Sequence, residues 1–171
     1  NGAARVYAVD VGYGQLAWSL RQNERVVVME RTNARSLTPD MFPESMDIGV
    51  MDLSFISIRL ILPALHGLLK PEGEIVCLIK PQFEAGRADV GKKGVVRDRA
   101  VHERVLAEMC DFFPTAGYTL MGLDYSPIRG PEGNIEFLFL LRHKGMENAA
   151  NRPDLDKIVE EAHKNTCAHP R

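Results

Sequence analysis

Apolar runs of strand length alternate with helical stripes along most of the chain. Six of these runs are short, apolar and partly β-branched, as expected of buried strands. They cover residues 5–11, 25–30, 46–52, 73–80, 118–126 and 135–143. Helical patterns lie between the first four runs and before the last two, and this βαβ order predicts a mostly parallel sheet. The last two runs have no helix between them, so we expect a hairpin that adds one antiparallel strand.

The predicted helices differ in length and in the clarity of their apolar faces. The longest pattern covers residues 99–113, with Val101, Val105, Met109 and Phe112 on one face. Shorter helical patterns cover residues 14–22, 38–44, 58–70 and 152–164. Residues 81–98 form a long polar loop. We therefore predict one domain over residues 1–144 and a tail with one short helix over residues 145–171.

Composition and charge narrow the class of protein. Of the 171 residues, 45% are hydrophobic and 26% are charged, which is the balance of an ordinary globular protein. The formal net charge of −2 means that any contact with RNA must come from a local basic patch. The cysteines Cys77, Cys110 and Cys167 are odd in number and far apart, so we expect free thiols in a reducing cytosol, with Cys77 and Cys110 in the core. No apolar run reaches the roughly 18 residues of a membrane span, and no signal peptide is visible.

Histidine and serine residues add little to the functional picture. The five histidines are scattered without the spacing of a metal site, so no metal is expected. His102 lies in the longest helix, and we expect it on the surface. Ser54 and Ser57 lack a matching histidine and aspartate, so a hydrolase triad is not expected.

The stretch VYAVDVGYGQLAW near the start of the chain has two interpretations. In the first, Asp10-x-Gly12-x-Gly14 is the glycine-rich cofactor loop after the first strand, and Glu30 at the end of the next strand binds a ribose hydroxyl. The second starts from the strand count, because an open sheet with a terminal hairpin is the usual layout of S-adenosylmethionine-dependent methyltransferases, which have seven strands. The predicted strands would then lack the first, and Asp10 would itself be the ribose-binding acid.

Several motifs together resemble one protein family. They are VDVGYGQLAWSLR, ERTNAR, DLSFIS, LIKPQFEAGR, GVVRD and SPIRGPEGNIEFL. In this combination, over residues 1–143, the chain resembles the TlyA family of hemolysin A proteins, whose catalytic domain is similar to the FtsJ/RrmJ ribosomal RNA 2'-O-methyltransferases. The resemblance implies a Rossmann-like methyltransferase fold and favours the second interpretation of the opening stretch.

The chain departs from the family pattern at its N-terminal end. It lacks the family's S4-like RNA-binding domain, the first strand, the glycine loop and the first lysine of the catalytic Lys-Asp-Lys-Glu set. The domain over residues 1–144 is therefore expected to be N-terminally incomplete, and this fragment alone is expected to bind the cofactor poorly and to be inactive.

Three residues match the rest of the family's catalytic set. Asp52 and Lys80 each end a predicted strand at the carboxyl edge of the sheet, where open α/β folds place their sites. From the residues alone, Lys80 could equally reach solvent, and Asp52 could cap a turn or a helix. Glu136 lies in an apolar run, so it is either on the solvent face of an edge strand or buried and paired. The resemblance implies that Asp52, Lys80 and Glu136 are catalytic.

Candidate binding residues lie around these three. Asp10 is the best candidate acceptor for the ribose hydroxyls of the cofactor, and Asp52 can face its positive sulfonium. Glu30 and Asn33 are expected near the adenosine, although polar strand ends are nearly as good an explanation. For RNA phosphates, the candidates are Arg87, Lys92, Lys93 and Arg97 in the polar loop and Arg129 in the turn 126–134. A solvated loop without function is the alternative, and few exposed aromatic residues are expected for base stacking.

The resemblance implies a cytoplasmic enzyme that uses S-adenosyl-L-methionine to methylate ribose 2'-hydroxyls of ribosomal RNA, at cytidines. Ribosomal RNA or ribosomal subunits would be its partners, and the upstream S4-like domain would supply much of the RNA affinity. One alternative is a non-enzymatic RNA-binding or hemolysin-like membrane-active protein, although no membrane-active helix stands out. A nicotinamide-dependent oxidoreductase built on Gly12 and Gly14 is a further alternative.

Overall fold

The computed structural model describes residues 2–143 and 153–167, and this part of the chain contains six strands. They are β1 (Val6–Val9), β2 (Val26–Met29), β3 (Met46–Met51), β4 (Leu69–Ile79), β5 (Tyr118–Tyr125) and β6 (Phe137–His143). The α-helices are α1 (Trp18–Arg21), α2 (Leu62–Leu65), α3 (Pro81–Glu84), α4 (Arg99–Thr115) and α5 (Leu155–Asn165). Short 3-10 turns are η1 (Ala34–Ser36), η2 (Pro39–Met41), η3 (Ile58–Leu60), η4 (Arg87–Asp89) and η5 (Lys92–Gly94). All six predicted strands are therefore confirmed.

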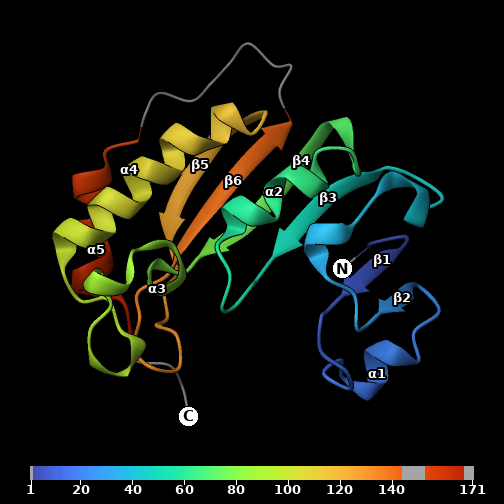
Figure 1. The fold of residues 1–171 in the computed structure, drawn as a ribbon, viewed down its shortest axis with the longest axis horizontal. Helices are drawn as coiled ribbons and strands as arrows, with labels where there is room; N and C mark the ends of the chain where they lie inside the picture. Colours follow the sequence, from blue (N-terminus) through green and yellow to red (C-terminus); the bar gives the residue numbers. More distant parts are fainter. Residues whose placement is uncertain (1, 144–152, 168–171) are drawn as a thin grey trace.

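The strands form two sheets (Figure 1). The larger sheet has the order β3-β4-β6-β5, with β3 parallel to β4 and β6 antiparallel to both of its neighbours. The predicted hairpin thus adds one antiparallel strand, β6, but this strand lies between β4 and β5 and not at the edge. The smaller sheet is the parallel pair β1-β2. This α/β architecture with a mixed sheet is the predicted fold class.

The outer edges of β1 and β3 have no strand partner within the described residues. In that part of the chain, β1 forms a ladder only with β2, and β3 forms a ladder only with β4. On one face of β3, Ile48 and Val50 are 54% and 74% exposed. Exposure of two apolar side chains on a strand is costly, at about 25 cal/mol for each Å² of apolar surface left in water. The outer face of β3 therefore leaves apolar surface in contact with water.

The core lies on the face of the larger sheet that α2, α4 and α5 cover (Figure 1). Alternate residues of β4 and β6 point to this face and are fully buried. They are Ile75, Cys77, Ile79, Phe137, Phe139 and Leu141. From α4 the fully buried residues are Val105, Leu106, Met109 and Phe113. Val159 and Ala162 of α5 are also fully buried, so the helix predicted in the tail docks on the domain.

The apolar face predicted for α4 is confirmed, because Val101, Val105 and Met109 are buried and Phe112 packs partly buried against the core, beside the fully buried Phe113. One detail of the other predicted helices was wrong. The helix predicted over residues 58–70 ends at Leu65, and β4 begins at Leu69, before Pro71. The reason is tertiary, because the backbone N–H of Met46 donates a hydrogen bond to the carbonyl oxygen of residue 68 at 2.8 Å and pairing with β3 draws the following residues into the sheet.

His102 is buried, which contradicts the expectation that it lies on the surface. Its side chain is 1% exposed because α5 covers this part of α4. Its Nδ1 lies 2.9 Å from Nε2 of His163 on α5, and its ring contacts that of Phe137 with centroids 5.7 Å apart. A single helix gives no sign of this, because the covering helix comes from a segment 61 residues away.

Of the cysteines expected in the core, Cys77 lies there, and Cys110 packs against it. Cys77, Cys110 and Cys167 form no disulfide, and Cys77 is fully buried, while Cys110 is half-buried against the core. Burial raises the pKa of the Cys77 thiol to about 12, which keeps it protonated and inert. No helix within residues 2–143 and 153–167 has the length and apolar content needed to cross a membrane.

We expect the free energy of unfolding to fall as the pH drops below 6.5 towards 4, because of His102. Burial first, and then the charge of His163, lower the pKa of His102 from its ordinary 6.5 to about 4. In this window the unfolded chain binds a proton that the folded chain does not, so protonation favours unfolding. Urea unfolding at about pH 4.5 and 7 measures the change. His102→Gln should reduce the pH dependence, and an unchanged dependence in this variant would contradict the assignment.

Candidate active site

Lys80 and Asp52 form an ion pair where two neighbouring parallel strands end. β3 ends at Met51 and β4 ends at Ile79, so both residues lie directly after their strands. The Lys80 Nζ lies 2.7 Å from the Asp52 Oδ1 and donates a hydrogen bond to the Ser54 Oγ at 3.0 Å. The side chain of Lys80 is 13% exposed, whereas that of Asp52 is 70% exposed. A largely buried ammonium thus lies next to a carboxylate that remains open to solvent.

Glu136 lies at the same edge of the sheet, directly before β6. The antiparallel ladder pairs Ile79 with Phe137, so the register continued by one residue places Lys80 opposite Glu136. Glu136 is 8% exposed, and β6 is an inner strand of the sheet. The alternative of a buried carboxyl is therefore confirmed over that of a solvent-facing edge position. All three predicted catalytic residues come from adjacent strand ends.

A glycine leaves the space that the Glu136 carboxyl occupies. A Cβ at Gly130 would lie 2.7 Å from the Glu136 Oε1 and 3.3 Å from its Cδ. Gly130 belongs to a turn in which its N–H donates to the carbonyl oxygen of Asn134 at 2.9 Å. The turn therefore packs its backbone against the glutamate side chain, which limits where the carboxyl can lie.

The arrangement of these charges supports chemistry on an oxygen atom. A lysine ammonium held at hydrogen-bond distance from a carboxylate is a preorganised donor for negative charge that develops on a nearby oxygen. An exposed carboxylate can accept a proton from a hydroxyl or bind a cation. Lys80 has the fixed position needed to stabilise the negative charge, and Asp52 has the exposure needed to accept a proton or bind a cation.

Asp10 ends β1 and is exposed at the end of the smaller sheet. Its Oδ1 accepts a hydrogen bond from the backbone N–H of Gly12 at 2.6 Å, and its carbonyl oxygen accepts one from Thr32 at 3.0 Å. Asn33 follows in the adjacent segment, where its side chain caps η1 by accepting a hydrogen bond from the backbone of Arg35. Asp10 and Asn33 thus lie in adjacent segments, and an exposed carboxylate at a strand end suits binding of ribose hydroxyls.

Glu30 makes several contacts within the protein. Its side chain is 7% exposed, and its Oε1 accepts hydrogen bonds from the N–H of Gly14 at 2.8 Å and from Arg21 Nη2 at 2.6 Å. The hydrogen bond from Arg21 is the main cause that lowers the pKa of Glu30. Glu30 therefore fastens the loop around Gly14 to the end of β2. A direct contact of Glu30 with adenosine remains a prediction.

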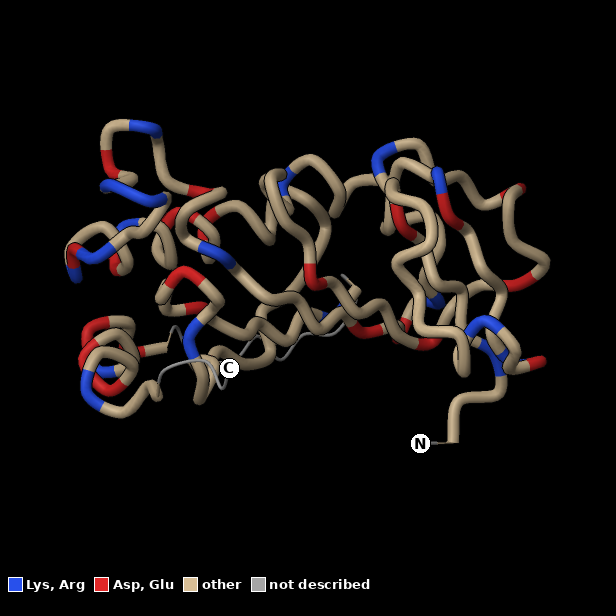
Figure 2. Tube along the Cα trace, turned by 90° about the horizontal axis from the view of Figure 1, so that it is seen from below, with Lys and Arg blue, Asp and Glu red and all other residues tan. Residues whose placement is uncertain are grey.

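The loop that carries four of the basic candidates is partly ordered by turns. Arg87, Lys92, Lys93 and Arg97 are all exposed, on or next to η4 and η5. Acidic residues are interspersed with basic ones along the part of the chain that the structure describes (Figure 2). With a net charge of −2, any contact with RNA would depend on local basic side chains.

Asn134 connects the basic loop to the glycine turn. Its side-chain amide accepts a hydrogen bond from the N–H of Val96 and donates one to the carbonyl oxygen of Gly94, both at 3.0 Å. Asn134 is 3% exposed, and Val96 is 2% exposed. The loop that was predicted to be polar therefore has a buried anchor two residues before Glu136.

Arg129 forms hydrogen bonds with the segment that follows α5. Its Nε donates a hydrogen bond to the Thr166 Oγ1 at 2.9 Å, and its backbone N–H donates one to the carbonyl oxygen of Cys167 at 3.0 Å. The segment after α5 thus pairs with the turn next to the site. The predicted contact of Arg129 with RNA stays a prediction.

Sequence reasoning missed two residues of this site. Ser54 was considered only as a hydrolase nucleophile, although it accepts the hydrogen bond from Lys80. Phe55 is 91% exposed, has a left-handed backbone with φ of 65°, and lies with its ring centroid 5.2 Å from that of Phe83. Tyr13 and Trp18 are also exposed, at 67% and 69%, so exposed aromatic side chains are few, as expected, but Phe55 is one of them and lies close to the site.

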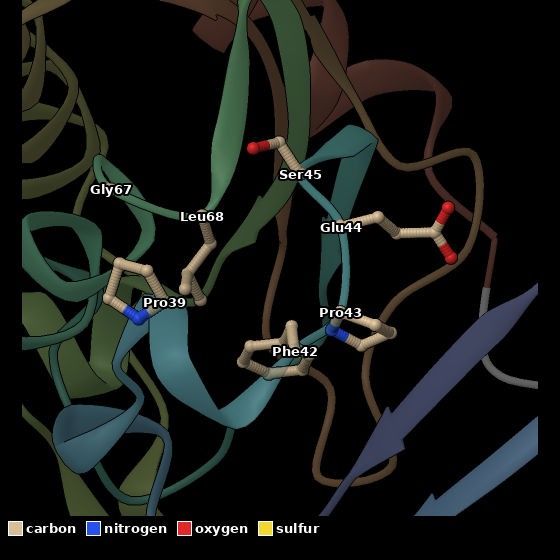
Figure 3. Close-up of a pocket in the computed structure, with 7 residues that line it drawn as sticks. All are labelled: Pro39, Phe42, Pro43, Glu44, Ser45, Gly67 and Leu68. Carbon is tan, nitrogen blue, oxygen red and sulfur yellow. The ribbon is translucent and has the colours of Figure 1, made fainter.

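A cavity of about 180 Å³ lies elsewhere in the molecule (Figure 3). Its lining residues are Pro39, Phe42, Pro43, Glu44, Ser45, Gly67 and Leu68. Ser45 and Leu68 directly precede β3 and β4, so the cavity is at the edge of the sheet opposite to Lys80. It plays no part in the candidate site.

Comparison with known families assigns the chain to one of them. The model of the family described as FtsJ-like methyltransferase matches residues 1–143. The chain belongs to this FtsJ-like methyltransferase family. Asp52, Lys80 and Glu136 all lie within the matched region, as do the six strands.

Two curated relatives and one solved structure are similar over most of the chain. The candidate rRNA methyltransferase YqxC of Bacillus subtilis is 54% identical over 96% of this chain. The 16S/23S rRNA (cytidine-2'-O)-methyltransferase TlyA of Mycobacterium tuberculosis is 47% identical over 89% of it. A candidate hemolysin from Streptococcus thermophilus has a solved structure that superposes with a TM-score of 0.91, at 46% identity over 96% of this chain and 60% of that one. The chain spans 60% of the length of both curated relatives.

Proposed function

We propose that the full-length natural protein transfers a methyl group from S-adenosyl-L-methionine to a ribose 2'-hydroxyl of ribosomal RNA, at a cytidine. The observation that carries the proposal is the 2.7 Å Lys80–Asp52 pair, with Glu136 opposite Lys80, at one edge of an FtsJ-like fold. The name of the Mycobacterium tuberculosis relative supports the choice of ribosomal RNA and cytidine.

The reaction needs a weak nucleophile to be activated. When bound, the cofactor supplies a methyl group on a positively charged sulfur. A ribose hydroxyl is a very weak acid, so the protein must place its oxygen in line with the methyl group and help to remove its proton. Positioning lowers the activation free energy by several kcal/mol. Assistance with removal of the proton increases the rate about 10²–10⁴-fold.

In our proposal, Lys80 and Asp52 have different roles in this activation. Lys80 stabilises the negative charge that develops on the 2'-oxygen, because its ammonium is already held by Asp52 and Ser54 and needs little reorganisation. Asp52, which is 70% exposed, is available to the positive sulfur or to the hydroxyl proton. Glu136 is buried opposite Lys80 and keeps the ammonium oriented.

The residues at the end of the smaller sheet fit an adenosyl group. Asp10 is exposed and has a second carboxylate oxygen beyond the one that binds Gly12, as expected of an acceptor for two ribose hydroxyls. We assign Asp10 to the ribose, Asn33 and Glu30 to the adenosine side, and Asp52 to the sulfonium.

Two surfaces beside Lys80 suit a single-stranded RNA segment. Phe55 lies three residues after Asp52 and presents an exposed ring, on which a base can stack for about 1–3 kcal/mol. Arg87, Lys92, Lys93 and Arg97 are exposed basic side chains for phosphates, with Arg129 in the turn beyond them. An S4-like domain upstream would supply further RNA affinity, with ribosomal subunits as partners in the cytoplasm.

We also propose that a strand from outside residues 1–171 pairs between β1 and β3 and brings the glycine loop and a further lysine to the site. The unpaired outer edges of β1 and β3, and the exposed Ile48 and Val50, support this. The 171-residue chain should then bind the cofactor at least about 100-fold more weakly than the full-length protein, since several of its contacts are absent. Calorimetry with both proteins measures this, and equal affinities would contradict the proposal.

The function is tested by incubating the full-length protein with ribosomal subunits and tritiated S-adenosylmethionine. We expect tritium in ribosomal RNA, and mapping of ribose 2'-O-methyl groups should find it at a cytidine. If no methyl group is transferred and the same protein releases dye from lipid vesicles, the membrane-active alternative holds. Binding of a nicotinamide cofactor instead would favour the oxidoreductase alternative.

Gly130→Ala should reduce methyl transfer about 10–100-fold with a smaller effect on folding. The new Cβ would lie 2.7 Å from the Glu136 Oε1, so the carboxyl must move, and displacement of a positioned group by about 1 Å costs on this order. Relief of the contact by a flexible side chain limits the loss of stability to about 1–3 kcal/mol. Turnover and urea unfolding are measured on the same sample. Unchanged turnover would show that the position of the Glu136 carboxyl does not matter.

A further inference from the structure

The side chain of Glu84 is a buried carboxylate, and the groups that donate hydrogen bonds to it all come from one short segment. The side chain is 2% exposed. Its Oε2 accepts a hydrogen bond from the Ser57 Oγ at 2.6 Å, and its Oε1 accepts one from the backbone N–H of Ile58 at 2.8 Å. Arg59 Nε lies 3.8 Å from the Oε2. Burial raises the pKa of Glu84, and these three contacts oppose the rise, so the ionised form is held only where the donors surround it.

The contacts of Glu84 join the two loops that carry the central ion pair. On one side, Glu84 ends α3, the single turn that starts directly after Lys80 and is closed by a 2.8 Å hydrogen bond from the N–H of Phe83 to the Lys80 carbonyl oxygen. On the other side, Ser57 and Ile58 follow Asp52 by five and six residues, at the start of η3. The rings of Phe55 and Phe83 meet between the same two loops.

We propose that Glu84 is a positioning residue for methyl transfer, which sets the separation of Lys80 and Asp52 by clamping their loops together. The inference rests on the proposed function and adds to it a residue that acts through the catalytic pair. The physical reason is that neither strand extends to the pair. β3 and β4 end one residue before Asp52 and Lys80, so both residues lie at the start of loops. The hydrogen bonds between β3 and β4 alone therefore do not fix the separation of the two side chains. A buried carboxylate with two well-formed hydrogen bonds is a strong link across such a gap.

The clamp also explains why the link is a carboxylate. Two donors, a hydroxyl and a backbone N–H, approach two different oxygen atoms of one group. A glutamine can accept from the Ile58 N–H with its single oxygen, but its amide N–H must then donate to the Ser57 Oγ, which reverses that bond. It also lacks the negative charge that strengthens both bonds. Glu84→Gln therefore weakens the clamp without changing the volume of the side chain.

The experiment measures kcat and KM for RNA methylation by the full-length protein and its Glu84→Gln variant. We expect kcat to fall about 10–100-fold, because the reacting groups lose their fixed separation. KM for RNA and the affinity for S-adenosylmethionine should stay within about twofold, since Glu84 is buried away from either ligand. Ser57→Ala, which removes one donor, should lower kcat about threefold to tenfold. In the double variant the loss should be smaller than the sum of the two single losses, because both changes act on the same contact.

Glu108→Gln is the matched control, because Glu108 is the other carboxylate that contacts Arg59, at 3.1 Å, but lies on the surface of α4. It should leave kcat unchanged. A wild-type kcat in Glu84→Gln, or losses that add in the double variant, would overturn the inference while the proposed function stands. An inactive wild-type protein would instead overturn the proposed function. If Glu84→Gln fails to fold, the kcat of Ser57→Ala decides the outcome.

Discussion

Lys80→Met in the full-length protein is expected to reduce methyl transfer about 10²–10⁴-fold while the protein stays folded. The loss in rate follows because the ammonium is the preorganised donor for the oxygen that is methylated. The fold should survive the change, because Asp52 is 70% exposed and stays hydrated. Some stability should be lost, since the buried Glu136 no longer has the ammonium opposite it. Single-turnover methylation of ribosomal subunits and urea unfolding are the two measurements.

The chain contains a matched control for this substitution. Lys70 and Asp47 form a second lysine–aspartate pair between the same two strands, β4 and β3, with Nζ and Oδ1 2.6 Å apart. This pair lies at the opposite edge of the sheet. Lys70→Met should keep the wild-type rate, since exposed ion pairs contribute at most about 1 kcal/mol to stability and this one is remote from the site. Equal rates for Lys80→Met and the wild-type protein would remove Lys80 from the mechanism.

Phe139→Ala is expected to lower the free energy of unfolding by about 3–5 kcal/mol, a large part of the about 5–15 kcal/mol of a typical domain. Phe139 is fully buried in β6, the inner strand that also brings Glu136 to the site. Its ring packs edge-on against that of Phe113 on α4, with centroids 5.1 Å apart. The cavity left by the ring cannot collapse easily, because β6 is paired on both sides. Urea unfolding followed by circular dichroism measures the loss.

Phe55→Ala is the control with the same side-chain change. Phe55 is 91% exposed, so its removal should change the free energy of unfolding by less than about 0.5 kcal/mol. The same variant should bind RNA more weakly by about 1–3 kcal/mol, because the proposed stacking of a base on the ring is lost. RNA methylation should fall accordingly. Equal stability losses for the two phenylalanine variants would contradict the described core.

Much of the fold was predictable because it follows from local periodicity. The six apolar runs became β1 to β6, and the apolar stripe of residues 155–162 became the buried face of α5. The ends of elements were less predictable. Leu69 and Lys70 continue a helical pattern in the sequence, yet pairing with β3 places them in β4. A strand partner can override local preference, and no window of sequence contains that partner.

The candidate site was predictable in part for a similar reason. Asp52 and Lys80 could be placed at one edge of the sheet, because the carboxyl ends of neighbouring parallel strands meet there. The contacts of Glu84 with Ser57 and Ile58 could not be foreseen, since they join segments 26 and 27 residues apart. For the same reason, Asn134 in its role as anchor and His102 at a helix interface were visible only in the folded chain.

By itself, the sequence determined which segments are strands and helices, and which side chains could perform chemistry on an oxygen atom. These properties depend on residue type and short-range spacing, which any segment carries with it. Only the tertiary structure decided that Lys80 pairs with Asp52 and Ser54, that Glu136 is buried opposite Lys80, and that the edges of β1 and β3 lack strand partners within the described residues. Those properties depend on distances between residues far apart in the chain, and packing of the sheet against its helices sets them.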